Sequence, residues 1–307
     1  MPAIHVSKSI TIQASAEKIF KILNDFHHWP AWSPWLVMEP NATVSIQPDG
    51  KFYSWEGNRT GSGEMKVVSE TSPKRLDLLV TFLKPWKSSS PVWFELNTKG
   101  DATEVTWHMD SKLPFFMFWM KKMMTAYIGM DYTRGLMMLK EYVEAGKVPS
   151  LLHFKGMSQY EGCNYVGIKT SCSMESMNTK MEQDFTRLFS WIEHHSGLMT
   201  GKAFSIYHKW DVVNDHVMYT AALPVKEIPV ELPAGFITGK IPASKVNTIV
   251  HTGPYKFLGN AYSTHYSMQR AKEYTYRKGT DPFETYVNLP GEVPDNELIT
   301  EVHFPAK

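Results

Sequence analysis

The sequence predicts an α+β protein made of two domains. Its 307 residues exceed the usual length of one domain, which is about 100–200 residues. In the first half, a run of strand-like segments ends in one long helical stretch. In the second half, the pattern strand–helix–strand–strand occurs twice. A Gly- and Pro-containing break at 146–150 separates these two rhythms, so we expect domains at residues 1–148 and 152–307.

The elements of the first half follow from hydrophobic periodicity. Residues 4–12 alternate as a strand, and Ser15 is a suitable N-cap for a helix over residues 16–25. Turn signals such as Pro48-Asp49-Gly50 then divide a series of strand-like runs. These runs lie near residues 42–47, 51–57, 62–71, 75–83, 89–98 and 102–110.

The long predicted helix carries a methionine-rich apolar stripe. From Phe116 to about Glu144, large apolar residues recur at three-to-four spacing, and a helix of that length can lie across a whole sheet. The stripe could be plain core, since Met fills irregular gaps, or it could line an adaptable apolar cavity. The candidate cavity residues are Phe116, Met120, Met123, Tyr127 and Met130.

The first half also holds most of the ten tryptophans. Tryptophan at strand spacing is more often core than part of a ligand cage, so we favour core. The residues concerned are Trp29, Trp32, Trp35, Trp55, Trp86, Trp93 and Trp107.

The second half predicts two rounds of one pattern, and hence an internal pseudo-repeat of about ninety residues. The first round contains a strand over 164–173, a helix over 175–194 and strands over 203–209 and 216–223. The second contains extended residues near 236–253, a helix at about 259–277 and strands near 283–288 and 297–304.

Composition excludes several classes of function. The formal net charge of +1 gives no global field for nucleic acid or an anionic membrane. The most apolar stretch, Leu113 to Met120, is too short to cross a bilayer, and no secretory leader is visible. Two isolated cysteines, Cys163 and Cys172, indicate a reducing compartment. We therefore expect a cytoplasmic protein without a membrane partner. Because no metal-ligand spacing, phosphate loop or nucleophile elbow occurs, we expect no metal and no cofactor.

Three segments of the first half carry a resemblance to a known family. They are Ile10 to Phe20, Trp32 to Trp35 and Gly135 to Lys140. With them, residues 3 to about 146 resemble the polyketide cyclase/START-like (SRPBCC) superfamily. The resemblance implies a helix-grip fold, in which a curved antiparallel sheet surrounds a long C-terminal helix and an apolar cavity lies between them.

Three ordered segments of the second half carry another resemblance. They are Val250 to Tyr255, Phe283 to Pro290 and Leu298 to Pro305. Residues 160–307 resemble the GyrI-like small-molecule-binding domain, which is also the effector-binding part of AraC- and MerR-type regulators. Since the two domains occupy the chain, we expect no helix-turn-helix and no direct binding of nucleic acid.

The principal site candidate is Glu301. Strand alternation places it on one face with Ile299 and His303. Spacing alone favours a solvent-facing edge residue, but the resemblance implies a pocket carboxylate, which we expect to face aromatic residues that include Tyr255. Burial among them would raise its pKa and make it a counter-charge for a cation or a general acid/base.

Three further residues of the second half are ligand-binding candidates. Tyr255 could present a ring face and a hydroxyl to a ligand, or it could be a turn residue. For Tyr286 we favour core. Glu284 could be a second pocket acid, although a surface position on the strand is favoured.

These observations support three functions. The leading hypothesis is a protein that binds an apolar or cationic organic ligand in a sensing, sequestering or detoxifying role, without its own DNA-binding module. The second is a hydrolase of reactive small-molecule toxins, with Glu301 as general acid/base and Tyr255 beside it. The third is an inhibitor of a protein partner such as gyrase. A ligand recovered unchanged favours the first, and turnover lost in Glu301→Gln favours the second. An exposed apolar or acidic patch favours the third.

Overall fold

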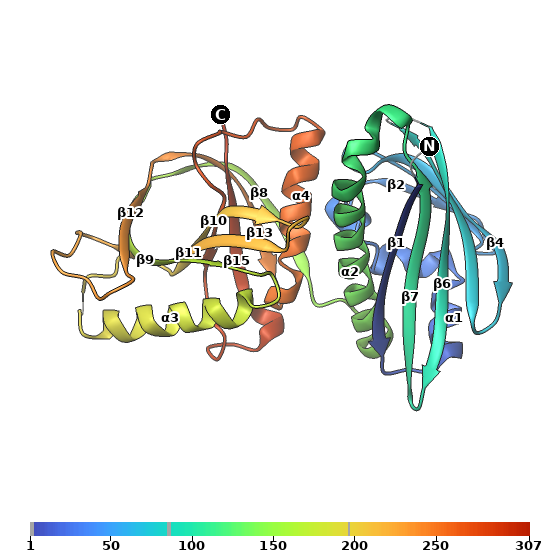
Figure 1. Ribbon diagram of the computed structural model, residues 1–307, viewed down its shortest axis with the longest axis horizontal. Coiled ribbons are helices and arrows are strands. Elements are labelled where there is room, and N and C mark those ends of the chain that lie inside the picture. Colours follow the sequence, from blue (N-terminus) through green and yellow to red (C-terminus); the bar gives the residue numbers. More distant parts are fainter. Residues whose placement is uncertain (1–2, 85–86, 196) are drawn as a thin grey trace. The chain divides into compact units, whose positions relative to one another are not determined.

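The computed structural model describes residues 3–84, 87–195 and 197–307. Trp86 lies outside these described residues. The chain divides into two compact units, Met1–Pro149 and Ser150–Lys307. Each unit has its own antiparallel sheet and its own helices (Figure 1).

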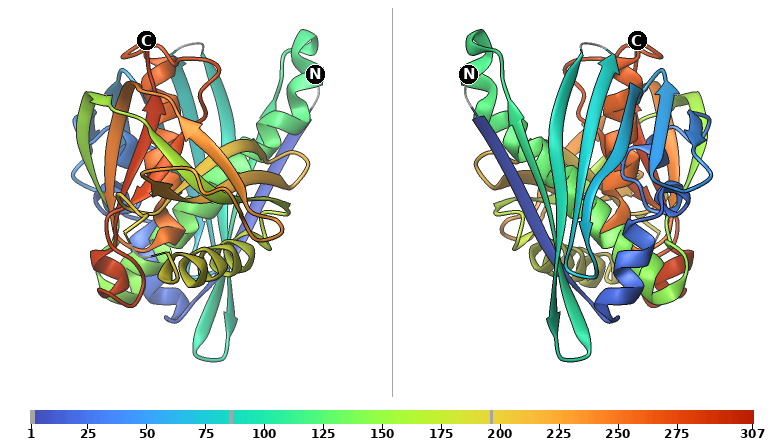
Figure 2. Two further views of the ribbon diagram at one scale, coloured as in Figure 1. Left: turned by 90° about the vertical axis from the view of Figure 1, so that its left-hand side faces the viewer. Right: turned by 90° about the vertical axis from the view of Figure 1, so that its right-hand side faces the viewer.

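The first unit is built on a seven-stranded antiparallel sheet whose order is β1-β7-β6-β5-β4-β3-β2. Every strand except β1 therefore lies beside its neighbour in sequence, and the long β6–β7 hairpin extends beyond the other strands (Figure 2). The strands are β1 (Ala3–Ile12), β2 (Thr43–Ile46), β3 (Phe52–Gly57), β4 (Gly61–Thr71), β5 (Arg75–Lys84), β6 (Ser88–Lys99) and β7 (Ala102–Lys112). The predicted series of strands is confirmed.

Short helices close one end of this sheet. Helix α1 (Ala16–Leu23) begins at Ser15, whose hydroxyl accepts a hydrogen bond from the backbone N–H of Lys18 at 3.3 Å, as the sequence predicts. The 3-10 helices η1 (Phe26–Ala31) and η2 (Leu36–Met38) follow it. They carry the tryptophan-rich turn into the core.

The long helix predicted from Phe116 forms in two parts. Residues Phe115–Met120 are the 3-10 helix η3, and Lys121–Ala145 are the α-helix α2, which packs against β1. The helix ends at Gly146, whose φ of 75° is left-handed and suits a residue without Cβ. A long helix against a curved sheet is the helix-grip arrangement that the resemblance implies.

The core of the first unit is aromatic. Trp29, Trp32 and Trp107 are each 1% exposed. The ring of Tyr132, from α2, stacks on Trp107 with the centroids 4.0 Å apart. A Cβ on Gly135 would lie 2.8 Å from the Trp107 ring, so the bare glycine lets α2 approach the sheet this closely. For these three tryptophans the core interpretation is confirmed.

The second unit is built on an eight-stranded antiparallel sheet with the order β12-β9-β11-β10-β14-β15-β13-β8. Its helices are α3 (Met177–Glu193) and α4 (Gly259–Arg270), with the short η4 (Tyr255–Phe257) and η5 (Asp295–Glu297). The strands are β8 (Leu151–Tyr160), β9 (Cys163–Cys172), β10 (Phe204–Asp211), β11 (His216–Val225), β12 (Ile237–Ile241), β13 (Ser244–Thr252), β14 (Phe283–Tyr286) and β15 (Ile299–Pro305).

This sheet confirms the predicted pseudo-repeat. The units β9-α3-β10-β11 and β13-α4-β14-β15 occupy corresponding places in the two halves, so the sheet order reads alike from either end. The pseudo-two-fold axis runs between β10 and β14, where Ser205 is paired with Glu284. Helices α3 and α4 pack on the same face of the sheet, over separate hydrophobic clusters. A third cluster, which includes Phe204 and Phe283, lies on the opposite face.

Strand β8 was not predicted, because only Leu152, Phe154 and Tyr160 of its inward face are large apolar residues, and Gly156 and Ser158 interrupt them. It lies at the edge of the sheet beside β13, and most of its side chains are exposed or half-buried. Gly156 adopts a φ of 77° where the pairing with β13 shifts register. An edge strand with one solvated side gives only a weak hydrophobic pattern.

The two units should fold independently when the chain is divided between Pro149 and Ser150. Ser150 belongs to the second fragment, because its hydroxyl lies 3.0 Å from His251 Nε2 and 2.9 Å from Asn260 Nδ2. We expect residues 1–149 and 150–307 each to give one cooperative transition in urea, followed by circular dichroism. If neither fragment unfolds cooperatively, the halves share one core and the boundary is wrong.

Candidate ligand-binding site

A buried carboxyl group lies at the centre of the second sheet. Glu284 is 2% exposed and belongs to the four-residue strand β14, next to the pseudo-two-fold axis. Strand alternation turns Glu284 and Tyr286 to the face that carries α3 and α4, and Phe283 to the other face. The Tyr286 hydroxyl donates to Glu284 Oε2 at 3.0 Å, and the Tyr207 hydroxyl, from β10, donates at 3.3 Å.

A third tyrosine approaches the same carboxyl group from α4. The buried hydroxyl of Tyr262 acts with those of Tyr286 and Tyr207 to lower the pKa of Glu284. The contact between the Tyr262 hydroxyl and Glu284 nevertheless does not meet the geometry of a normal hydrogen bond. The Tyr262 hydroxyl is thus buried without a hydrogen-bond partner among the described residues. Tyr262 and Tyr207 are also in ring contact, with their centroids 5.7 Å apart.

Desolvation dominates the electrostatics of this group. Burial penalises the charged form and raises the pKa of Glu284 to about 7, although the three tyrosine hydroxyls act in the opposite direction. Among the described residues no Lys, Arg or His forms an ion pair with Glu284. Burial therefore makes the protonated form of Glu284 accessible near neutral pH, and the ionised form lacks a compensating cation among the described residues.

Aromatic side chains surround Tyr286. The rings of Tyr255 and Phe185 lie 5.5 and 5.6 Å from that of Tyr286, centroid to centroid. The Tyr286 hydroxyl lies 2.9 Å from Ser205 Oγ and 3.7 Å from the sulfur of Met181 on α3. The structure thus brings Tyr255, Tyr286 and Glu284 together, as three of the four candidates from the second half.

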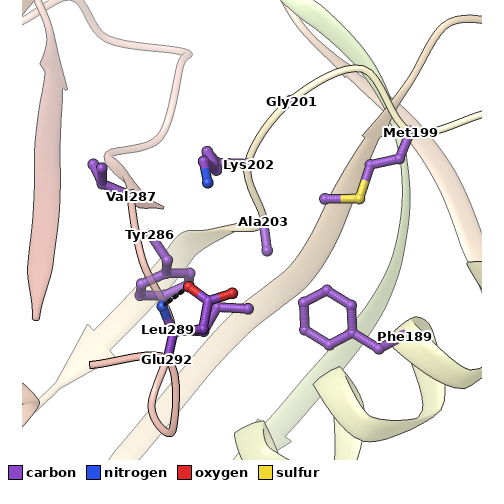
Figure 3. A pocket seen from close by; sticks show the side chains of 9 residues that line it. All are labelled: Phe189, Met199, Gly201, Lys202, Ala203, Tyr286, Val287, Leu289 and Glu292. Atoms are coloured by element: carbon purple, nitrogen blue, oxygen red, sulfur yellow. Dashed lines mark hydrogen bonds between the residues drawn. The ribbon is translucent and has the colours of Figure 1, made fainter. Parts of the chain in front are cut away.

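An open pocket of about 380 Å³ adjoins this cluster through Tyr286. Phe189, on α3, and Met199 lie across the pocket from Tyr286 (Figure 3). Lys202 and Glu292 are exposed charged residues in its lining. The remaining lining residues are Gly201, Ala203, Val287 and Leu289. Tyr286 is therefore shared by the pocket and the buried carboxyl group.

Glu301 does not lie in this cluster, which corrects the expectation that it faces Tyr255. In the β14–β15 register Glu301 pairs with Thr285, so its side chain points to the opposite face from Glu284. Its Oε1 forms an ion pair with Lys155 Nζ at 3.0 Å, and its Oε2 lies 3.6 Å from His303 Nε2. The motif at Leu298 to Pro305 correctly predicted strand β15. The carboxylate that faces the tyrosines, however, is Glu284 on β14.

The candidates of the first unit divide into two groups. Phe116 is 75% exposed and Tyr127 is 52% exposed, so these two do not line an interior cavity. Met120, Met123 and Met130 are half-buried along η3 and α2, and their contribution to a cavity stays a prediction.

The aromatic core of the first unit contains two unpaired donors. The indole N–H groups of Trp32 and Trp107 are buried without a hydrogen-bond partner among the described residues. An interior acceptor, such as a ligand oxygen, would satisfy them.

Among the described residues, no group of three or more His, Cys, Asp or Glu side chains could hold a metal ion. No described helix is both long and apolar enough to cross a membrane.

Two family models match the chain, one in each unit. Residues 3–144 match the model for polyketide cyclase/dehydrase and lipid transport proteins. Residues 159–307 match that for the GyrI-like small molecule binding domain. Both resemblances inferred from the motifs are confirmed. No curated protein matches the sequence.

Solved structures resemble parts of the chain at low identity. An EcmrR–DNA complex is 19% identical, with a TM-score of 0.42, over 63% of this chain and 72% of that chain. SAV2435 bound to tetraphenylphosphonium is 13% identical, with a TM-score of 0.38, over 50% and 94%. A START superfamily protein from Mycobacterium smegmatis is 20% identical, with a TM-score of 0.34, over 47% and 99%.

The raised pKa of Glu284 predicts a specific pH dependence of stability. The pKa of Glu284 is about 7 in the folded state, and the ordinary value for a solvated glutamate is 4.5. The folded state therefore binds this proton more tightly than the unfolded state, and stability falls as the pH rises from about 4.5 to about 7. The loss attributable to this group is about 3 kcal/mol.

Urea unfolding at pH 5 and pH 8 measures this loss when the wild type is compared with Glu284→Gln, which does not titrate. We expect the variant to gain relative stability at pH 8. An equal effect of pH on the two proteins would show that Glu284 is not desolvated.

Proposed function

We propose that this protein captures organic cations in its second domain. Residues 159–307 match the GyrI-like small molecule binding domain, whereas residues 3–144 match the polyketide cyclase/dehydrase and lipid transport model. The observation that supports this proposal best is the Glu284 carboxyl group. It is buried among tyrosine rings and has no cationic partner among the described residues. Sensing or sequestering such ligands is the biological role that we infer.

Burying the charge of Glu284 costs free energy. An ionised carboxylate in an apolar interior is destabilising unless a cation or several hydrogen bonds compensate it. The tyrosine hydroxyls compensate Glu284 only in part, since its pKa remains raised. An organic cation in the adjoining pocket would supply the missing charge across a medium of low dielectric constant, and so favour the ionised form.

The same surroundings select an aromatic or otherwise apolar cation. Tyr286 presents its ring to the pocket, and Phe189 lies opposite it. Rings of this kind attract a cation by its charge and an aromatic ligand by stacking. A small inorganic cation would lose its hydration shell there without gaining enough oxygen ligands. Glu292 is exposed, so water screens its charge more than that of Glu284.

Glu284→Gln should weaken the binding of an aromatic cation about tenfold, since the substitution keeps the shape and removes the charge. N-methylacridinium is a suitable probe, and acridine is its neutral analogue at pH 8. We expect the affinity for acridine to change less than about twofold. Wild-type affinity for N-methylacridinium should also rise between pH 6 and pH 8, as Glu284 ionises. Fluorescence titration measures both effects.

Glu301→Gln is the matched control, because it removes the same charge from the opposite face of the sheet. It should leave the affinity for both probes unchanged. A loss of cation affinity in Glu301→Gln, but not in Glu284→Gln, would show that the ligand binds on the face of Glu301, as the family resemblance implied.

A hydrolase is the second candidate, favoured by the pKa of Glu284 near 7 and by its contact with Tyr286. A carboxyl group with such a pKa can donate and accept protons at neutral pH. It could protonate the leaving atom of a strained ring while water adds to the neighbouring carbon, with the water proton passing to the carboxylate.

Mass spectrometry distinguishes the two candidates. After incubation with an epoxide or cyclopropane electrophile, a hydrolase yields product heavier by one water. We expect Glu284→Gln to abolish that product while retaining substrate binding, because proton transfer acts in the transition state. If all the electrophile is recovered unchanged, the protein does not hydrolyse it, and ligand binding remains as its function.

A further inference from the structure

Large aromatic side chains are exposed where α2 begins. Phe116, Phe118 and Trp119 of η3 are 75%, 61% and 69% exposed. Apolar groups of this size usually contribute to a core, and exposed apolar clusters mark surfaces that bind something. In Figure 2, η3 and the first turns of α2 extend beyond the end of β1, which is the strand that α2 packs against.

Positive charge accompanies these side chains. Lys121 and Lys122 follow η3 directly, and Lys112 precedes it at the end of β7. All three lysines are exposed, and none forms an ion pair with a described residue. No Asp or Glu occurs between Asp110 and Asp131. Although the whole chain is close to neutral, this segment carries a local charge of about +3.

We propose that this basic aromatic patch, Phe116, Phe118, Trp119, Lys121 and Lys122, binds the surface of an anionic lipid bilayer. Aromatic rings partition into the interfacial region of a bilayer, and lysines pair with its anionic headgroups. The binding is peripheral. The expectation that the protein has no membrane partner rested on the absence of a spanning segment and on the net charge of the whole chain, neither of which excludes a local patch.

Charge argues against a second copy of the chain as the occupant. A two-fold self-contact places the same surface on both sides of the interface. The lysines of both copies would then lie in one interface that carries no Asp or Glu from this segment, and like charges repel when they are brought close together and desolvated. An anionic lipid surface offers the apolar depth and the opposite charge at once.

Vesicle flotation of the full-length protein tests this proposal. We expect binding to phosphatidylcholine vesicles that contain about 30% phosphatidylglycerol, little binding to phosphatidylcholine alone, and release as the salt concentration rises to about 0.5 M. Lys121→Gln with Lys122→Gln should weaken binding about 25-fold, at about fivefold for each lysine. Phe116→Ser with Trp119→Ser should weaken it to a similar degree.

Controls separate this surface from general effects. Lys66→Gln with Lys74→Gln removes two other exposed lysines, and Val230→Ser removes another exposed apolar side chain. Both should bind vesicles as the wild type does, and all variants should melt at the wild-type temperature. Equal, weak binding to both kinds of vesicle would overturn the proposal. So would a dimer in sedimentation that Phe116→Ser with Trp119→Ser dissociates while vesicle binding is absent.

Discussion

Both proposed functions of the second domain depend on one carboxyl group that is kept out of water. Glu284 is buried on the helix-covered face of the second sheet, and tyrosines from β10, α4 and β14 surround it. Beside the pseudo-two-fold axis, Met181 of α3 contacts Tyr286, and Tyr262 of α4 contacts Tyr207. Because desolvation holds the pKa of Glu284 near 7, the group is not tied to one protonation state. Both candidate functions of this domain, capture of a cation and transfer of a proton, use that property.

The fold was largely predictable because its elements bury one face each. Strands with alternating side chains and helices with an apolar stripe leave clear periods in the sequence. Ser15 caps the start of α1, and Gly146 caps the end of α2. The weakly patterned pieces were not predictable. Strand β8 is an edge strand without a fully buried side chain. The aromatic residues of η3 are of the types that usually form a core, so the sequence alone does not reveal that they are exposed.

The site was predictable in part, and the error concerns strand alternation. Residues two apart on a strand share a face, so a core position for Tyr286 requires a buried position for Glu284. The same rule separates Glu301 from the apolar residues Val302 and Phe304, which face α4. For Glu301 we followed the family motif instead of strand alternation, and the motif placed the carboxylate on the wrong face. Tyr207 and Tyr262 could not be found from the sequence, since only the folded sheet brings β10 and α4 to β14.

The central claim is that Glu284 is a desolvated carboxyl group with a pKa close to neutrality. The most direct measurement is a carbon-13 NMR titration of protein labelled at glutamate side-chain carboxyls, with the signal assigned from Glu284→Gln. The account predicts a signal that titrates near pH 7 in the free protein and at lower pH when N-methylacridinium is bound. A signal that titrates near the ordinary value of about 4.3 and ignores the cation would contradict it.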